Sequence, residues 1–388
     1  MALGRLLLVA LIVRGVYNLW WIGLNVTPVS DALDYHLMAI QLLETGTITH
    51  LGRPPLFPAL LAGVYGLFGP DPLAGRLFLS VIDTMTCGVI FLIGREMFGN
   101  RVGLWAAWAS TGYIMLFQWT GSLLTEVPFT FFLCLFIWLA QRGLRTHSRV
   151  DFLVAGLFLG LATLTRPTTL MFLPFIPVWA WLAFPGRWRL VLVPSALIVG
   201  IAVLTLAPWT IRNYAATTHF IPVTVMGGQV MLGANNPRVL DEFAGGWIPP
   251  LRSGLITQAD TVGRSPVERD ALYQRKAMAF ITANPLYFAR LCVYKFKLFW
   301  HLNRASDPAS LQYLLVAAFA AVGTVLNRRR WREIGLLYFL PFFFTLSALI
   351  FWGDDRIRSP LEPVLLIFAA TAWTWTADAV KSRWAREN

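Results

Sequence analysis

The segment that follows the first apolar stretch carries residue types that could do chemistry. Asp31 and Asp34 lie three residues apart, so their side chains share one face of a helix. Leu33, Leu37 and Ile40 fall near the opposite face, as in a helix lying on a membrane surface. A carboxylate here could act as a general base, or it could cap the helix, with Asp34 completing a pattern similar to a capping box. The spacing alone leaves both interpretations open.

An arginine and two prolines follow this helix. Arg53 precedes Pro-Pro, which favours an extended chain before a second, short apolar helix over residues 56–68. His36 and His50 are close by, but lone histidines at an interface are more often bystanders than active groups. The two predicted helices would bracket a pocket at the boundary between lipid and water.

The composition indicates that a membrane holds these elements. The chain has 388 residues, of which 57% are hydrophobic and only 13% are charged, whereas soluble proteins are usually about one quarter charged. The net charge of +12 could suggest nucleic-acid binding, but the basic residues stand in short clusters between apolar runs, as membrane topology explains. Three widely spaced cysteines indicate neither a disulfide framework nor a metal site. An integral membrane protein is expected.

Apolar windows of roughly 17 to 25 residues predict an all-α polytopic fold with about ten transmembrane helices. The first is expected to be a retained span, since no small-residue cleavage site follows it. The predicted spans are 2–24, 73–97, 101–119, 123–141, 151–166, 168–184, 189–210, 309–327, 333–351 and 360–378.

The distribution of arginines predicts the orientation of these spans. Basic residues concentrate in alternate loops, at 95–101, 142–149, 187–189 and 328–332, which predicts that these loops are cytoplasmic. Residues 1–388 are expected to form one membrane-embedded domain with amphipathic helices in an extracytoplasmic loop over 25–72. A long extracytoplasmic segment over 211–308 is expected to wrap the mouth of this domain. All the candidate chemistry then lies on the extracytoplasmic side.

Several segments in order resemble the GT-C superfamily of membrane glycosyltransferases. Asp31 stands four residues before Tyr35, and the amphipathic helix is followed by RPPLFP. The other matching segments are GRLFLSVIDTMTCGVIFLIGREMFGNRVGLWAA, LLTEVPFTFF, GLATLTRPTTLMFLPF, PWTIRNY, GGQVMLGANNP and RIRSPLEPVLLIFAA. The chain is most similar to bacterial proteins of glycosyltransferase family 39 type, which resemble protein mannosyltransferases and the lipid A aminoarabinose transferase. The resemblance runs from about residue 30 to the C-terminus.

The resemblance implies a reaction that needs a single base. The leaving phosphodiester is already a stabilised anion, so one carboxylate suffices to deprotonate the acceptor, unlike the paired carboxyls of glycosidases. Asp31 matches that base, and Glu126 matches a second acidic position that could place a hydroxyl or amine acceptor. Glu126 could also share a divalent metal, Mg or Mn, with Asp31, or it could be a first-turn glutamate favoured by the helix dipole. Metal use varies in the superfamily, so no cofactor is predicted.

Cations at the external interface could bind the donor phosphate. The alternative for each is snorkelling or pairing with lipid head groups. Arg356 and Arg358 precede an apolar helix whose N-terminus would also face the phosphate. The candidate substrate-binding residues are Asp34, Tyr35, Arg53, Arg166, Arg212, Arg356 and Arg358.

Two features depart from the pattern or lack a role in it. Asp83 lies inside the second predicted span where the family is often small, and Arg76 is seven residues before it on the same face. A buried ion pair, for which Arg14 is a further candidate partner, is favoured over catalysis. The stretch 227–237 matches a family loop without an assigned role, and turn chemistry alone could explain it.

The resemblance implies an inverting transferase that moves a sugar from a polyprenyl-phosphate donor to a glycan, lipid or protein acceptor. Its expected location is the bacterial cytoplasmic membrane, among membrane lipids and without nucleic acid. One alternative is a transporter or flippase for lipid-linked sugars, which would favour inverted repeats and helices broken at the midplane. Another is a non-catalytic binding subunit, against which the presence of both Asp31 and Glu126 argues.

Overall fold

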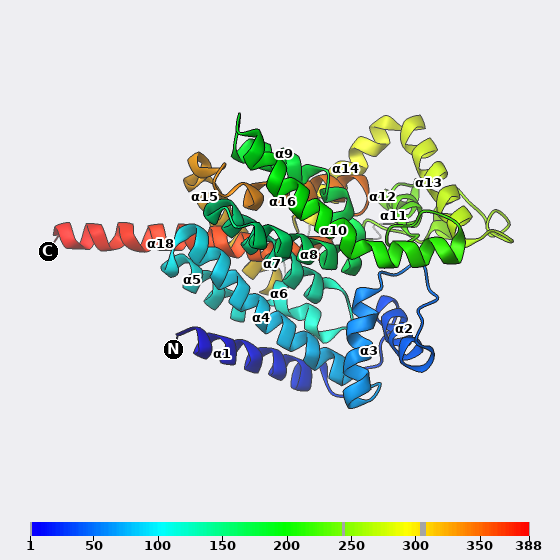
Figure 1. The fold of residues 1–388 in the computed structure, drawn as a ribbon, viewed down its shortest axis with the longest axis horizontal. Helices are drawn as coiled ribbons and strands as arrows, with labels where there is room; N and C mark the ends of the chain where they lie inside the picture. The colour runs from blue at the N-terminus through cyan, green and yellow to red at the C-terminus, as the bar shows by residue number, and fades with distance from the viewer. Residues whose placement is uncertain (1, 243–244, 303–307, 388) are drawn as a thin grey trace.

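The computed structural model describes residues 2–242, 245–302 and 308–387. The chain is 78% helical, and these residues contain no strand, which confirms the all-α prediction. The long helices run side by side, with both termini at one end of the molecule and the shorter helices α2, α3 and α11 to α13 at the other (Figure 1). The apolar composition and these helices make the chain an integral membrane protein.

Within the described residues, six helices are long and apolar enough to cross a membrane. Each of them coincides with a window predicted from the sequence. In two cases the span is built from consecutive helical pieces that continue one another. The six are α1 (Ala2–Val16) with the π-helical turn η1 (Tyr17–Ile22), α4 (Pro72–Phe98), α7 (Glu126–Thr146), α10 (Trp188–Thr217), α15 (Pro308–Leu326), and α17 (Asp355–Arg358) continuing through η6 (Ser359–Leu361) into α18 (Glu362–Glu387).

The other four predicted windows are helical but shorter or broken. Gly112 ends one helix and Pro167 follows another, so neither run reaches the roughly 20 residues of a straight span. The number of ten membrane crossings is therefore not established by helix length. The four windows hold α5 (Asn100–Thr111) with α6 (Ile114–Phe117) and the 3-10 turn η2 (Gln118–Gly121), α8 (Arg149–Thr165), η3 (Pro167–Phe172) with α9 (Phe175–Ala183), and α16 (Gly335–Ile350).

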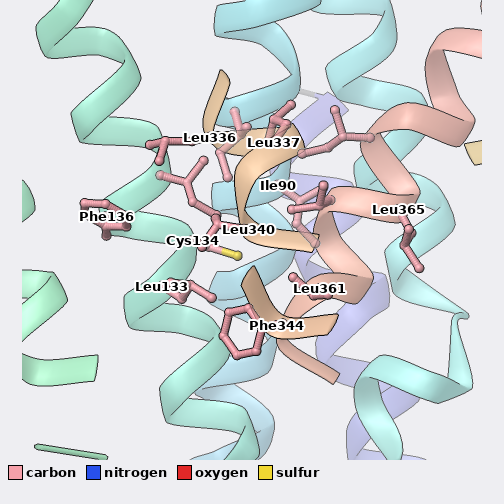
Figure 2. Packing of buried hydrophobic residues seen from close by; sticks show 14 of the residues in the cluster. Ile90, Leu133, Cys134, Phe136, Leu336, Leu337, Leu340, Phe344, Leu361 and Leu365 are labelled. Atoms are coloured by element: carbon pink, nitrogen blue, oxygen red, sulfur yellow. The ribbon is translucent and has the colours of Figure 1, made fainter. Parts of the chain in front are cut away.

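The main apolar core lies where α4, α7, α16 and α18 meet. Leu133 and Cys134 of α7 point toward Leu340 and Phe344 of α16, with Ile90 of α4 behind them (Figure 2). All of these side chains are fully or almost fully buried. The core therefore joins segments from both halves of the sequence and fixes the helix ends that carry charged residues.

A buried ion pair ties α1 to α4. Arg14 Nε donates to Asp83 Oδ2 at 2.6 Å, and both side chains are inaccessible to solvent. The same guanidinium donates to the carbonyl oxygens of Ser110 and Thr111 at the end of α5. The predicted Arg14–Asp83 pair is thus confirmed, and it holds three helices together where an unpaired charge would be costly.

The amphipathic elements of the 25–72 loop form as the sequence predicts. α2 (Asp31–Thr45) buries Tyr35 and Met38 and exposes Leu33 and Leu37, and it ends where Gly46 adopts a positive φ of 68°. α3 (Leu56–Phe68) follows the two prolines and packs against α2. A helix with apolar residues on both its buried and its exposed face suits a position at the membrane surface.

The segment over 211–308 folds into short helices, described except at residues 243–244 and 303–307. α13 carries a capping box made by Ser265 and Glu268. The helices are α11 (Gly227–Ala234), α12 (Arg238–Asp241), the 3-10 turn η4 (Pro250–Arg252), α13 (Pro266–Ala283) and α14 (Pro285–Phe299).

The loop at 227–237 anchors this segment to the membrane helices. Asn235 Nδ2 donates to the carbonyl oxygen of Ile350, and Asn235 Oδ1 accepts from Lys295 Nζ at 2.7 Å. Lys295 Nζ also donates to the carbonyl oxygen of Leu349, at the end of α16. The asparagine thus joins α11 to both α14 and α16, which gives the loop a structural role.

The arginine-rich loops lie at the end of the molecule opposite to α2 and α3. Arg145, in the last turn of α7, forms an ion pair with Glu96 at the end of α4. Arg330, in the 3-10 turn η5 (Arg328–Arg330), donates to the carbonyl oxygen of Met97. Helix α7 has 21 residues, so it is about 30 Å long. The basic loops are therefore separated from Glu126, at the start of α7, by about the thickness of a membrane core.

Candidate active site

Arg53 joins the two carboxylates at the start of α2. Its Nη2 donates to Asp31 Oδ1 at 2.5 Å and to Asp34 Oδ2 at 2.8 Å. Its Nε donates to the same Asp34 oxygen at 3.1 Å. Both aspartates therefore share a helix face, as their spacing predicts, and one guanidinium bridges them.

Arg356 joins Asp31 to Glu126. Its Nη1 donates to Asp31 Oδ2 at 2.7 Å, and its Nε donates to Glu126 Oε1. Arg166 Nη1 donates to the same glutamate oxygen at 3.2 Å. Arg53 thus binds one carboxylate oxygen of Asp31, and Arg356 binds the other.

Six residues form a continuous network, which we call the arginine–carboxylate cluster. It contains three guanidinium groups and three carboxylates, so its formal charge is zero. Exposure decreases along it, from 44% for the Asp34 side chain to 27% for Asp31 and 1% for Glu126. The cluster is therefore open at Asp34 and closed at Glu126. Its members are Asp31, Asp34, Arg53, Glu126, Arg166 and Arg356.

The members of the cluster lie at helix ends and turns. Asp31 begins α2 directly after Ser30, whose φ of 52° is uncommon for a residue with a side chain. Glu126 begins α7, and Arg166 follows the last residue of α8, where Pro167 stops the helix. Arg356 lies in the single turn of α17. Because these ends meet at one side of the bundle, residues spread over most of the sequence come together.

The electrostatics of Asp31 depend on its two arginines. Burial acts to raise the pKa of the Asp31 carboxyl, but Arg356 and Arg53 outweigh burial and hold this pKa below its ordinary value. The carboxylate is therefore ionised at neutral pH. Both of its oxygens accept hydrogen bonds from guanidinium groups, and Ser30 makes no side-chain cap. The geometry favours a charged functional group over a simple helix cap.

The side chain of Tyr35 lies next to the arginine–carboxylate cluster. Arg53 sits over its ring, with the guanidinium carbon 5.6 Å from the ring centroid. Burial raises the pKa of the phenol, while the nearby charges of Arg53, Arg356 and Arg166 act to lower this pKa and Glu126 acts to raise it. The hydroxyl is thus within electrostatic reach of the whole cluster and is neutral at physiological pH.

One carboxylate oxygen of Glu126 makes no hydrogen bond within the described residues. Its Oε1 accepts from Arg356 and Arg166, whereas no donor among the described residues lies within hydrogen-bond distance of the buried Oε2. Buried polar atoms are nearly always paired. This oxygen is therefore an unused hydrogen-bond acceptor at the closed side of the cluster.

Arg358 is not brought into the cluster. It is fully buried, pairs with Glu362 at 2.8 Å, donates to the carbonyl oxygen of Phe299 and sits over the ring of Tyr313. Tyr113 donates to the other oxygen of Glu362 at 2.7 Å. The prediction that Arg358 contacts the donor phosphate does not agree with this burial, because the side chain already links α14, α15 and α18.

Arg212 also lies apart from the cluster. Its guanidinium donates to the carbonyl oxygen of Ile48 and to Asn213, and it sits over the Trp209 ring. The Ile48 contact fixes the chain between α2 and Arg53. Arg212 therefore positions the loop that carries Arg53 and does not itself reach Asp31 through any contact in the described part of the chain.

The carboxylates of the cluster do not fit a divalent metal. Both oxygens of Asp31 and one oxygen of Glu126 are already bound by guanidinium groups, and three arginines would repel a cation placed between them. Across residues 2–242, 245–302 and 308–387, no group of three or more potential ligands of the His, Cys, Asp or Glu type converges.

A cavity of about 710 Å³ opens beside the cluster, and apart from Asp34 and His50 its lining residues were not singled out from the sequence. Asp34 and Gly52 form the wall next to the cluster, while Gln229 of α11 and Asp270 and Tyr273 of α13 line the other side. Their only signal is that α13 is a polar helix within an apolar chain. Without the tertiary fold, nothing connects α13 to α2.

Comparison with known proteins gives the chain relatives among membrane transferases. Residues 52–211 match the family described as dolichyl-phosphate-mannose-protein mannosyltransferase. That match includes Arg53, Glu126 and Arg166 and begins after Asp31. A curated relative is the undecaprenyl phosphate-alpha-4-amino-4-deoxy-L-arabinose arabinosyl transferase 2 of Pseudomonas fluorescens (strain Pf0-1). It is 22% identical over 395 residues, which cover 96% of this chain and 69% of the relative.

Two solved structures of the oligosaccharyltransferase of Archaeoglobus fulgidus share the fold. The complex with an inhibitory peptide and a dolichol-phosphate has a TM-score of 0.62 at 13% identity and is matched over 100% of this chain and 51% of its own. The form tethered with an acceptor peptide has a TM-score of 0.64 at 13% identity, with the same coverage. The chain thus spans about half the length of these enzymes. Taken with the family match over 52–211, the shared fold makes the chain similar to the GT-C superfamily of membrane glycosyltransferases.

Proposed function

We propose that this protein is an inverting glycosyltransferase that moves a sugar from a polyprenyl-phosphate donor to an acceptor at the extracytoplasmic face of a bacterial cytoplasmic membrane. The observation that carries the proposal is the placement of Asp31 between Arg53 and Arg356, at the exposed side of the arginine–carboxylate cluster. A base and two phosphate-binding cations thus stand within hydrogen-bond distance of one another. The names of the relatives, which include undecaprenyl phosphate and dolichyl-phosphate-mannose, support a donor of this class.

The donor phosphate would compete with the aspartates for the arginines. Arg53 and Arg356 can offer charge-assisted hydrogen bonds to phosphate oxygens. Once they do so, Asp31 loses the pairing that lowers the pKa of its carboxyl, and the effect of burial, which raises this pKa, remains. Donor binding would therefore turn a weak base into a stronger one next to the sugar.

The transfer itself is a displacement at the anomeric carbon. The acceptor oxygen attacks that carbon while the bond from carbon to the phosphate oxygen breaks, and its electron pair leaves with the phosphate. Asp31 takes the acceptor proton as general base, and the Arg53 and Arg356 side chains hold the charge that develops on the leaving phosphate. Glu126 Oε2 would accept from a hydroxyl of the acceptor or of the sugar and orient it.

The sidedness follows from the two ends of the helix bundle. The arginine–carboxylate cluster and the helices of residues 211–308 lie at one end, and Arg145 and Arg330 lie at the other. Since positively charged loops favour the cytoplasm, we propose that the cluster is extracytoplasmic. The four shorter helical windows would complete ten crossings by packing inside the bundle.

Labelling of single cysteines in intact cells tests this orientation. A cysteine at position 27, which is exposed and four residues before Asp31, should react with an impermeant maleimide added outside, and a cysteine at position 329 should react only after the membrane is permeabilised. A cysteine at position 147, in the loop after α7, serves as a second internal site. Reaction at position 329 but not at position 27 would reverse the proposed orientation.

The activity is tested with purified protein and a panel of polyprenyl-phosphate sugars. Each donor is mixed with possible acceptors, and sugar transfer is followed by mass spectrometry. Product of inverted anomeric configuration, lost in the Asp31→Asn variant, is expected. Movement of intact donor across vesicles without transfer would instead indicate a flippase, and donor binding without either process would indicate a binding subunit.

A further inference from the structure

The cavity beside the cluster has the size of a substrate site. Its volume of about 710 Å³ falls within the range of roughly 300 to 1,000 Å³ of small-molecule sites. It lies between α2, the loop over residues 49–52, and the helices α11 and α13. Helices α2, α11 and α13 lie at the end of the bundle opposite to the two chain termini (Figure 1).

The wall of the cavity at Asp34 lies one hydrogen-bonded group away from the candidate base Asp31. Asp34 lines it, and the Oδ2 atom of Asp34 accepts from Arg53 Nη2, the same nitrogen that donates to Asp31 Oδ1. Only one nitrogen atom thus separates the Asp34 and Asp31 carboxylates. A molecule that fills the cavity past Asp34 would present its nearest group to Asp31.

Hydrogen bonds hold the walls of the cavity in place. Asp270 Oδ1 accepts from the backbone N–H of Gln229 at 2.9 Å and fastens α13 to the start of α11. The helices approach so closely that a Cβ at Gly228 would lie 1.9 Å from the Asp270 carbonyl oxygen. The backbone N–H of Val225 donates to the carbonyl oxygen of Leu51 at 2.9 Å and closes the third side. The cavity is therefore defined by backbone contacts and not only by mobile side chains.

The lining chemistry suits hydroxyl groups and not anions. Gln41, Thr49, Gln229 and Tyr273 each offer both donor and acceptor atoms, as the hydroxyl groups of a sugar require. Partial burial lowers the pKa of His50, so its imidazole is neutral at physiological pH. The lining carries two carboxylates, Asp34 and Asp270, against one guanidinium, Arg269. Because Asp34 is paired with Arg53, and Arg269 is balanced by Asp270, the wall carries no excess positive charge to bind a phosphorylated acceptor.

We propose that this cavity is the acceptor site and that it binds a neutral, hydroxyl-rich glycan, whose terminal hydroxyl reaches Asp31 past the Asp34 and Arg53 side chains. This inference rests on the proposed transferase function and adds the class of its acceptor. A peptide acceptor could not bind here by adding a strand to a sheet edge, because the described residues that line the cavity come from helices and a loop.

The test uses one donor, three acceptors and three variants. A polyprenyl-phosphate sugar found to be active is offered with a neutral oligosaccharide, a Ser- and Thr-containing peptide, or a phosphoglycolipid. The variants are Gln229→Ala and Tyr273→Ala in the cavity wall, and Gln274→Ala as a matched control on the exposed side of α13. Donor binding is measured separately, by quenching of tryptophan fluorescence without acceptor.

Transfer to the neutral oligosaccharide is expected. Each wall variant should raise the KM for that acceptor by about three- to ten-fold, as the loss of one or two hydrogen bonds would. Donor binding should be the same in the wild type, both wall variants and the Gln274→Ala control. If these residues had a purely structural role, their loss would change acceptor KM and donor binding together.

Three outcomes would overturn the inference. Transfer to the peptide or to the phosphoglycolipid but not to the oligosaccharide would show that the acceptor class is wrong while the transferase function stands. Transfer to the oligosaccharide at unchanged KM in both wall variants would place the acceptor elsewhere. Absence of donor binding and of transfer with every donor and acceptor would refute the proposed function itself, and the acceptor site with it.

Discussion

Two groups of arginines and carboxylates in this protein contrast in their surroundings. In the helix bundle, Arg14 pairs with Asp83 and Arg358 pairs with Glu362, and all four side chains are at most 1% exposed. In the arginine–carboxylate cluster, Arg53 bridges two aspartates and is 16% exposed. The same residue types therefore occur in closed pairs and in an open network.

The difference shows which charges are free to act. An arginine in a closed pair is also held by backbone carbonyls, as Arg14 is by Ser110 and Thr111, so it cannot leave its partner without stranding a charge. In the open network Arg53 and Arg356 each bridge two carboxylates, and an incoming phosphate can replace one of them. A substrate site is thus distinguished from a structural ion pair by arginines that are shared between carboxylates and exposed to solvent, more than by the presence of charge.

The largest expected effect is on the chemical step. Asp31→Asn keeps the size of the side chain and removes the basic oxygen, so the rate of transfer should fall by about 100- to 10,000-fold. Asp34→Asn, the matched control on the same helix face, should retain substantial activity. Single-turnover transfer with bound donor measures both. Near wild-type turnover of the Asp31 variant together with an inactive Asp34 variant would move the base by one turn, and full activity of both would exclude catalysis at this loop.

The closed pair should respond in stability instead of rate. Asp83→Leu alone leaves Arg14 buried without its partner and should lower the free energy of unfolding by about 3 to 5 kcal/mol. The double variant Arg14→Met, Asp83→Leu removes both charges and should recover most of that loss. Unfolding in detergent reports the stability, and activity per folded molecule should stay near that of the wild type. A rate loss like that of Asp31→Asn in the folded protein would contradict the structural role.

Arg53 and Arg358 offer a direct comparison of an open and a closed arginine. Arg53→Ala removes a charge-assisted contact of about 1.5 to 3 kcal/mol, so apparent donor affinity should fall by about ten-fold or more. Arg358→Ala should leave donor affinity unchanged and reduce stability, because it strands Glu362 in the core. Titration with donor and thermal unfolding of both variants separate the two effects. A lower donor affinity in Arg358→Ala at full stability would return this residue to the phosphate site.

The smallest effect concerns pH. The two arginines hold the pKa of Asp31 below its ordinary value of about 3.9, so kcat/KM, which reports the free enzyme, should fall only as pH drops through this lowered pKa. If the donor phosphate takes over the arginines, the pKa of Asp31 rises and the acidic limb of kcat should lie at higher pH. Rate profiles at low and saturating donor measure both limbs. An acidic limb of kcat at the same or lower pH would argue against competition for the arginines.

Much of the local structure could be predicted because it depends on short-range rules. The apolar run over 56–68 became α3, the Gly46 stop ended α2, and Asp31 and Asp34 share a face because they are three residues apart. The Arg14–Asp83 pair was also predictable, since a charge inside an apolar span needs a partner of opposite sign. These inferences required only helix geometry and the cost of burying charge.

The fate of each arginine could not be predicted in the same way. Arg356 and Arg358 are two residues apart near the start of the same apolar stretch, yet one contacts Asp31 and the other is buried against Tyr313. Residues two apart on a helix point in different directions, and only the packing of α14 and α15 decides which direction is the core. The pairing of α13 with α2 across the cavity depends equally on contacts between distant segments.

The sequence by itself determined that this is a membrane-embedded helical protein with a carboxylate and arginines in its first loop, because hydropathy and helix periodicity are local properties. Tertiary structure alone decided that Arg53 and Arg356 converge on Asp31, that Arg358 does not, and that a polar cavity opens next to Asp34. These outcomes depend on how helix ends separated by as many as 325 residues meet, and no short-range rule specifies that meeting.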